Sequence, residues 1–109
     1  MVKQAITEYS AILTTAPNSD QAKRIIDALL SEKLAACIQT IPIESHYVWE
    51  GEVCNDNEIL LVIKTTNALF REVEQSICEQ HEYDIPQIVQ LPITDGFNPY
   101  LSWISQLTR

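Results

Sequence analysis

The 109-residue sequence predicts a single α+β domain, residues 1–109, with the element order βαββαβ followed by a terminal helix. Segments rich in β-branched and aromatic residues alternate with segments whose apolar residues recur at helical spacing. Proline, asparagine and aspartate residues mark the boundaries between these segments. The chain is also too short to give two domains a core each.

The first strand and helix are predicted in the first third of the chain. Residues 5–15 are rich in β-branched and aromatic types and predict a strand. Residues 16–20 end the strand with a proline and supply polar side chains that can cap a helix. A helix to about Lys33 follows, because apolar residues recur at i, i+3, i+4, i+7 and i+8. They are Ala22, Ile25, Ile26, Leu29 and Leu30.

The middle of the chain predicts a pair of strands and a third, central one. Residues 34–43 predict a largely buried strand, broken or bulged near Pro42. Residues 45–53 alternate in polarity and predict a further strand segment, and residues 54–57, Cys-Asn-Asp-Asn, predict the turn after it. Residues 58–66 form the most apolar stretch and predict a central strand that is buried on both faces.

The last third predicts a second helix, a final strand and a short helix. Asn67 is predicted to cap the second helix. Residues 86–94 predict the last strand, and residues 95–96, Asp-Gly, the turn after it. Residues 98–99, Asn-Pro, predict the start of the terminal helix. The expected inner faces of the two helices hold Leu69, Phe70, Val73 and Ile77, and Leu101, Ile104 and Leu107.

This element order is typical of the ferredoxin-like, split βαβ fold, in which two helices cover one face of a four-stranded antiparallel sheet. Here the strands are apolar on both faces, so the face without helices must also be covered. We expect the terminal helix to cover part of it and another subunit to cover the rest. Residues 45–66 are also long for so small a domain, and long hairpin edges pair between chains. The sequence therefore predicts a homo-oligomer.

Charge and motifs exclude several classes of function. The chain carries 7 Lys and Arg against 15 Asp and Glu, a net charge of −8, and its cations are scattered. We therefore expect neither nucleic-acid nor membrane binding, and a cation is the more natural small partner. The start has no secretory pattern, and no apolar run approaches the roughly 20 residues of a membrane helix. No catalytic or phosphate-binding motif is present, so we do not expect an enzyme.

The three cysteines are spread along the chain, which is typical of a protein in a reducing cytosol. They are Cys37, Cys54 and Cys78. Their number is odd and no two form a Cys-x-x-Cys pair, so neither a disulfide framework nor a zinc knuckle is predicted. A site for a soft metal ion remains open, because thiolates prefer ions such as Cu(I).

Five spaced segments resemble the CutA family of divalent-cation tolerance proteins. They are residues 34–37 (Leu-Ala-Ala-Cys), 45–51 (Ser-His-Tyr-Val-Trp-Glu-Gly), 64–66 (Lys-Thr-Thr), 81–88 (His-Glu-Tyr-Asp-Ile-Pro-Gln-Ile) and 92–104. The resemblance spans roughly residues 8–107. It implies the ferredoxin-like fold, a cytoplasmic homotrimer in which long hairpins pair between subunits, and a part in tolerance of copper and other divalent cations.

The resemblance also implies where a metal would bind. Metal-binding members of the family have a cysteine near the end of the first strand and two histidines after the second helix. The matching positions here are Thr14, Gln80 and His81, and Glu82 stands where the family has a proline. One ligand of three is retained, and a hydroxyl and an amide are poor ligands for a soft ion.

His81 is nevertheless the best candidate ligand for copper or another divalent cation. Cys78 lies three positions earlier, so one helical turn would place both side chains on one face. Cys37 is a third candidate thiolate, although free cysteines are commonly buried and this one also suits a close subunit contact. His81 has its own alternative, a solvated helix end where a histidine complements the helix dipole. The nearby oxygen donors are Glu79, Glu82 and Asp84.

Three aromatic residues are candidate subunit contacts: Tyr47, Trp49 and Trp103. Tyr and Trp dominate interface energetics, and we favour that role. The alternative is a ligand cleft, where aromatic side chains are also common. It belongs to a second hypothesis, a small-molecule sensing module similar to the trimeric PII signalling proteins. A structural scaffold is a third.

Overall fold

The structure is a computed structural model that describes residues 7–109. It contains four strands and three α-helices in the predicted order, which confirms the α+β fold. Residues 5 and 6 of the first predicted strand lie outside the described residues. The elements are β1 (Tyr9–Ala16), α1 (Ser19–Ser31), β2 (Cys37–Trp49), β3 (Glu52–Thr66), a short 3-10 helix (Asn67–Leu69), α2 (Phe70–Gln80), β4 (Ile88–Pro92) and α3 (Asn98–Leu107).

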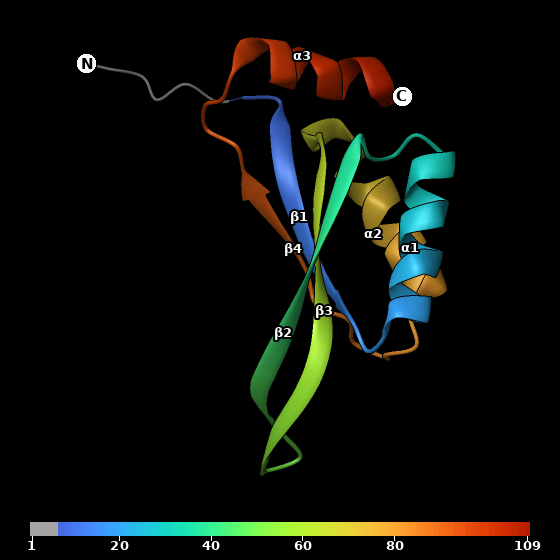
Figure 1. Cartoon of the computed structure of the whole chain (residues 1–109), viewed down its shortest axis with the longest axis vertical. Helices are drawn as coiled ribbons and strands as arrows, with labels where there is room; N and C mark the ends of the chain where they lie inside the picture. The colour runs from blue at the N-terminus through green and yellow to red at the C-terminus, as the bar shows by residue number, and fades with distance from the viewer. Residues whose placement is uncertain (1–6) are drawn as a thin grey trace, which may run out of the picture.

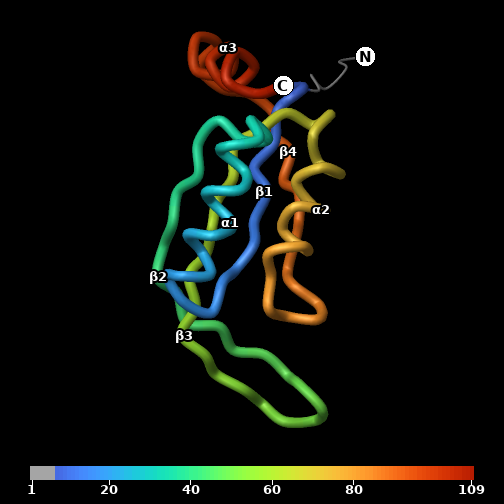
Figure 2. The backbone as a smooth tube through the Cα atoms, turned by 90° about the vertical axis from the view of Figure 1, so that its right-hand side faces the viewer, coloured from blue at the N-terminus to red at the C-terminus, as the bar shows by residue number. Residues whose placement is uncertain are grey.

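The four strands form one antiparallel sheet in the order β2-β3-β1-β4. Both α1 and α2 lie on one face of this sheet, and α3 crosses one end of it (Figure 1). The β2–β3 hairpin extends well beyond the other two strands at the opposite end (Figure 2). This is the ferredoxin-like arrangement, with one sheet face left without a helix along most of its length.

The core lies between the sheet and the two helices. Ile12 on β1 and Ile63 on β3 are opposite each other and fully buried beneath α1 and α2. Ile25 and Leu29 of α1 meet them, as the helical spacing predicts. Each fully buried aliphatic side chain contributes about 1.5–3 kcal/mol to stability. The same alternation turns the neighbouring strand residues to the opposite face.

The predicted break near Pro42 is wrong. Strand β2 pairs with β3 in one continuous register from Cys37 opposite Lys64 to Trp49 opposite Glu52. Pro42 fits within it because β2 is an edge strand, so its missing N–H group can face the side that has no neighbouring strand.

The predicted turn at residues 54–57 is also wrong, because these residues belong to β3. The hairpin turns instead at Glu50 and Gly51, whose φ angles are 51° and 80°. A two-residue hairpin loop with two positive φ angles follows the natural twist of the strands. Gly51 adopts such an angle at no steric cost, whereas Glu50 does not.

The helix starts follow the predictions unevenly. The side chain of Asn18 caps α1 by accepting a hydrogen bond from the N–H of Gln21, at 2.8 Å, within the predicted capping segment. Asn67 does not cap α2. It begins the 3-10 helix, and its side-chain amide donates to the carbonyl of Thr7 at 3.0 Å. Pro99 lies in the first turn of α3, as predicted.

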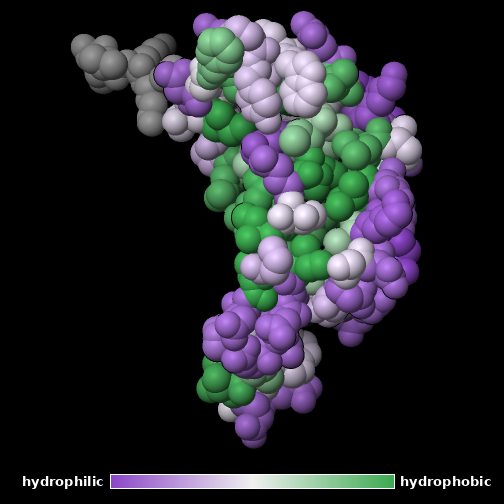
Figure 3. Space-filling view, in the orientation of Figure 1, coloured by the Kyte–Doolittle hydropathy of each residue, from purple (hydrophilic) through white to green (hydrophobic). Residues whose placement is uncertain are grey.

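The sheet face away from α1 and α2, here called the open face, is apolar. In one chain β3 is therefore fully buried on its helix side only, which corrects the prediction of burial on both faces. Figure 3 shows hydrophobic side chains gathered over the middle of the sheet, below α3. The exposed apolar residues of the open face include Ile41, Val89 and Leu91, together with Tyr47 and Trp49 on the hairpin, and the half-buried ones include Ala11, Leu13, Ile43, Leu60 and Val62.

Helix α3 covers one end of the open face, as predicted. The Lys64 ammonium lies 5.7 Å from the centre of the Tyr100 ring. The hydroxyls of Tyr9 and Ser105 are 2.6 Å apart and share a hydrogen bond. The rest of the open face is left uncovered by the described residues of this chain.

Candidate functional site

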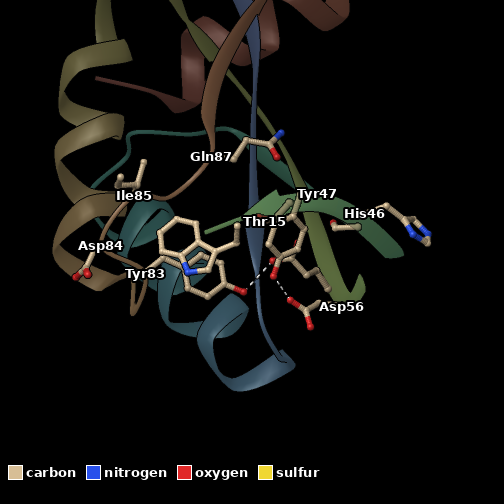
Figure 4. A pocket seen from close by; sticks show the side chains of 11 residues that line it. Thr15, His46, Tyr47, Asp56, Tyr83, Asp84, Ile85 and Gln87 are labelled. Atoms are coloured by element: carbon tan, nitrogen blue, oxygen red, sulfur yellow. Dashed lines mark hydrogen bonds between the residues drawn. The ribbon is translucent and has the colours of Figure 1, made fainter. Parts of the chain in front are cut away.

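A cavity lies at the other end of the open face, between the β2–β3 hairpin and the loop after α2. Its volume is about 570 Å³. Three parts of the chain form its wall: the end of β1, the hairpin strands, and loop residues 83–87 (Figure 4). The lining residues are Thr15, Ser45, His46, Tyr47, Trp49, Asp56, Glu58, Tyr83, Asp84, Ile85 and Gln87.

Glu58 and Tyr83 join the hairpin to the loop. The Tyr83 hydroxyl donates a hydrogen bond to Glu58 Oε2 at 2.8 Å. Only 9% of the Glu58 surface is exposed, so this carboxylate is largely removed from water. Burial, and then the hydrogen bond to Glu58, raise the pKa of Tyr83 above its ordinary value. Tyr83 therefore stays a neutral hydrogen-bond donor at physiological pH.

A second tyrosine–carboxylate pair forms within the hairpin. The Tyr47 hydroxyl donates to Asp56 Oδ2. Tyr47 lies opposite Cys54 and Ser45 lies opposite Asp56, so Tyr47 and Asp56 are diagonal neighbours on one sheet face. The hydrogen bond to Asp56 is the main reason that the pKa of Tyr47 is raised to about 12. Figure 4 shows Tyr47, Tyr83 and Asp56 converging, whereas His46 points away.

His81 and Gln21 hold the loop in place. The His81 Nε2 lies 2.6 Å from the carbonyl oxygen of Thr15, and Nδ1 accepts the N–H of Tyr83 at 3.0 Å. The buried Gln21 side chain donates to the carbonyl of Gln80 at 2.7 Å and accepts the N–H of Glu82 at 3.0 Å. These four bonds fix the path of the chain as it enters the pocket wall.

The three metal-ligand candidates are not brought together. Cys78 is exposed on α2, whereas Cys37 is half-buried on the open face opposite Lys64. His81 sits beside the end of β1 with both ring nitrogens hydrogen-bonded. Within residues 7–109, no three His, Cys, Asp or Glu side chains are grouped closely enough to hold a metal ion.

The copper ligand positions implied by the resemblance do not fit a copper ion either. Thr14 is fully buried, and its hydroxyl oxygen has no hydrogen-bond partner among the described residues. It pairs with Leu61 on the helix side of the sheet, away from the open face. His81 already uses its Nδ1 lone pair to accept from Tyr83. The three positions therefore offer a buried hydroxyl, an amide and an imidazole whose lone pair is already hydrogen-bonded. These groups form no open site for a soft ion.

The three interface candidates are all partly exposed. Tyr47 and Trp49 lie in the wall of the pocket. Trp103 lies on α3 and stacks on Tyr100, with ring centres 5.6 Å apart. Their role between subunits stays a prediction.

Sequence reasoning missed Glu58, Asp56 and Gln21. Glu58 begins the most apolar segment of the sequence, and a charged residue in that place could have indicated a functional side chain. Gln21 lies beside the apolar helix positions, but its partners are 59 and 61 residues away. Asp56 was assigned to a turn. The fold brings the hydrogen-bonded pairs of this site together, so short stretches of the sequence give little sign of them.

The fold, the uncovered apolar face and the pocket beside the hairpin define a small ferredoxin-like protein with an exposed apolar sheet face. The family described as the CutA1 divalent ion tolerance protein matches residues 10–107. The chain belongs to this family, which confirms the resemblance found in its motifs.

Several relatives are similar along most of the chain. The divalent-cation tolerance protein CutA of Thermus thermophilus is 41% identical over 89% of this chain and 95% of its own length. The chloroplastic protein CutA of Arabidopsis thaliana is 42% identical over 90% of this chain. The chain spans about half the length of that plant protein, 54%.

Solved structures of family members are also similar to this chain along most of its length. CutA1 of Oryza sativa has a TM-score of 0.91 and 41% identity, over 95% of this chain and 96% of its own. The structure of CutA of Archaeoglobus fulgidus, described as a periplasmic divalent cation tolerance protein, has a TM-score of 0.91 and 36% identity, over 93% and 99%. One of these relatives is thus described as chloroplastic and another as periplasmic. In this chain no described helix is long and apolar enough to cross a membrane.

Proposed function

We propose that this chain acts as a homotrimer in the tolerance of divalent cations, in the cytoplasm, as a binding protein without a catalytic step. Membership of the CutA1 family supports the link to divalent cations. The relatives from Thermus thermophilus and Archaeoglobus fulgidus, which are described as divalent-cation tolerance proteins, are matched over nearly their whole length. The observation that carries the assembly is the apolar open face.

The open face suits a second and third copy of this chain. Exposed Ile41, Val89 and Leu91 come from both outer strands, so the apolar surface crosses the whole sheet. Burying apolar surface stabilises an assembly by about 25 cal/mol per Å². The edge of β2 also offers a long unpaired row of backbone groups to a neighbour.

The assembly is tested by light scattering at one protein concentration. We expect the wild-type mass to be three times that of one chain, and Ile41→Asp to lower it. Leu30→Asp is the matched control, because Leu30 is exposed to a similar fraction (43%, against 47% for Ile41) and lies on α1, away from the open face and the hairpin. A monomeric wild type would contradict the trimer. An unchanged mass for Tyr47→Ala with Trp49→Ala would remove those two residues from the interface and leave the trimer standing.

Binding of copper or another divalent ion is the finer part of the proposal. Cys78 is exposed and His81 is near it in sequence, but His81 must release the N–H of Tyr83 before Nδ1 can bind an ion. We therefore expect weak affinity, with Cys37 too separate to contribute to the same ion. Copper titration of the reduced protein by calorimetry tests it, with His81→Ala and Cys78→Ser as variants. Unaltered binding in both variants would exclude these ligands.

The pocket favours a second candidate function, the sensing of a small molecule by the trimer. A cavity of about 570 Å³ with aromatic walls and a few polar groups is typical of small-ligand sites. A thermal-shift screen of metabolites tests it. Stabilisation by no compound would contradict it.

A further inference from the structure

We propose that the pocket binds a small organic cation, a compound with protonated amines on an apolar carbon body. The inference deepens the second candidate function above and rests on it. It is carried by the juxtaposition of Glu58, Asp56 and three aromatic rings around one cavity.

The first support is a buried carboxylate that lacks a counter-charge. Glu58 is nine-tenths buried and forms no ion pair among the described residues. Oε2 accepts from Tyr83, whereas Oε1 accepts no hydrogen bond from residues 7–109 and stays accessible to solvent. A largely buried charge is costly unless it is paired. A protonated amine in the pocket would replace water as the donor to Oε1 and supply the missing charge.

The second support is that both tyrosine–carboxylate pairs present hydrogen-bond acceptors to the pocket. Tyr47 and Tyr83 both give their hydroxyl protons to carboxylates, Asp56 and Glu58. Each hydroxyl oxygen and the second oxygen of each carboxylate can then only accept. Because both tyrosines hold their protons well above physiological pH, the arrangement persists there. Such a surface selects ligands that carry N–H donors.

The third support is the charge and chemistry of the wall. Asp56, Glu58 and Asp84 line the cavity, and no Lys or Arg is among its described lining residues. The rings of Tyr47 and Trp49 add faces that attract cations. An anionic ligand such as a nucleotide would be repelled.

A bare metal ion suits this cavity less well. The carboxylates are not grouped with a third ligating side chain in the described part of the chain. A volume of about 570 Å³ is also far larger than one ion needs, whereas it can enclose a short diamine with its carbon chain. Ile85 in the wall gives that chain an apolar contact.

Three four-carbon probes of similar size separate charge from shape. We would titrate the assembled protein by calorimetry with 1,4-diaminobutane, 1,4-butanediol and succinate, and then with copper(II). We expect binding of the diamine alone among the three, weakening as salt is added. Equal binding of the neutral diol would overturn the inference while leaving a small-molecule function.

Matched variants locate the site. Glu58→Gln and Asp56→Asn remove one charge each with little change of shape. We expect each to weaken the affinity for the diamine by about tenfold or more, since hydrogen bonds to charged groups are stronger than those to neutral groups. Glu44→Gln is the control, because Glu44 is exposed and faces away from the pocket on the same strand. If Glu58→Gln fails to fold, Asp56→Asn alone decides.

The remaining outcomes are also decisive. Diamine binding that ignores both pocket variants would overturn the inference. Copper binding that depends on Glu58, without diamine binding, would overturn it and favour the metal function. If the diamine does not bind but another compound stabilises the protein in the thermal-shift screen, the organic-cation inference is overturned and the small-molecule function is retained. No binding of any small molecule would remove the second function as well.

Discussion

The Tyr83 hydroxyl donates a hydrogen bond to Glu58 across 25 residues of sequence, at 2.8 Å. This one bond joins the loop after α2 to the middle of the long β3 strand. It also supplies the only hydrogen bond from a described residue to a largely buried carboxylate. The stability of the protein and the shape of the pocket therefore depend on the same contact.

Tyr83→Phe should destabilise the protein by about 1–2 kcal/mol, because it leaves the Glu58 carboxylate buried without its donor. Urea unfolding at a fixed protein concentration measures the loss. Tyr9→Phe is the control, since it removes a hydroxyl whose bond to Ser105 is exposed to water. An equal loss in the two variants would show that burial of Glu58 carries no special weight.

Two of the four tyrosines should lose their hydroxyl protons at a higher pH than an ordinary tyrosine. The raised pKa of Tyr47, about 12, means that its neutral form is favoured by folding. Its stabilising contribution is complete below pH 10 and is lost as the pH rises towards 12. Tyr83 shifts in the same direction. Absorbance of tyrosinate should show a delayed phase that disappears in the Tyr47→Phe, Tyr83→Phe double variant. An unchanged delayed phase would place it on other tyrosines.

The hairpin turn should respond oppositely to two neighbouring substitutions. Glu50 has a φ of 51°, which asparagine tolerates better, so Glu50→Asn should stabilise the protein by a few tenths of a kcal/mol. Gly51 has a φ of 80°, so Gly51→Ala should destabilise it by about 1 kcal/mol, although a Cβ there meets no atom within 4 Å. Thermal unfolding compares them. Equal effects of the same sign would contradict the positive φ angles.

His81 should carry its proton on Nε2. Nδ1 accepts the N–H of Tyr83, and the carbonyl of Thr15 can only accept, so Nε2 must donate to it. Imidazole nitrogen chemical shifts at neutral pH distinguish the two tautomers. The opposite tautomer would place the proton on Nδ1, contradict the hydrogen bond from the Tyr83 N–H, and leave Nε2 as the atom that could bind a metal.

The elements that could be predicted from the sequence are those set by local pattern. The spacing of Ile25 and Leu29 indicated the buried face of α1, and both residues are fully buried. The hairpin turn was mispredicted because Asn55 to Asn57 have stronger turn composition than Glu50-Gly51. Pairing along the whole length of β2 and β3 outweighed that local preference.

The candidate site could be predicted only in part. Tyr47 and Trp49 were selected by residue type as subunit contacts, with a ligand cleft as the alternative, and they line the cavity. The hydrogen-bond partners of Tyr83 and Gln21 lie 25 to 61 residues away in the sequence, so no short motif predicts them. Thr14 was compared with a ligand position by resemblance, but sequence alone could not show that its hydroxyl faces the core.

The unbroken register of β2 and β3 has a thermodynamic consequence. Ile41 of the open face and Tyr47 of the pocket lie on the same side of one continuous strand, six residues apart. A partner seated at one end and a ligand held at the other share a single structural support. If the proposed ligand binds the assembled chain more tightly than the separated chain, assembly and ligand occupancy are linked equilibria and each changes the apparent strength of the other by the same factor. In that case, dilution of the protein would release its ligand.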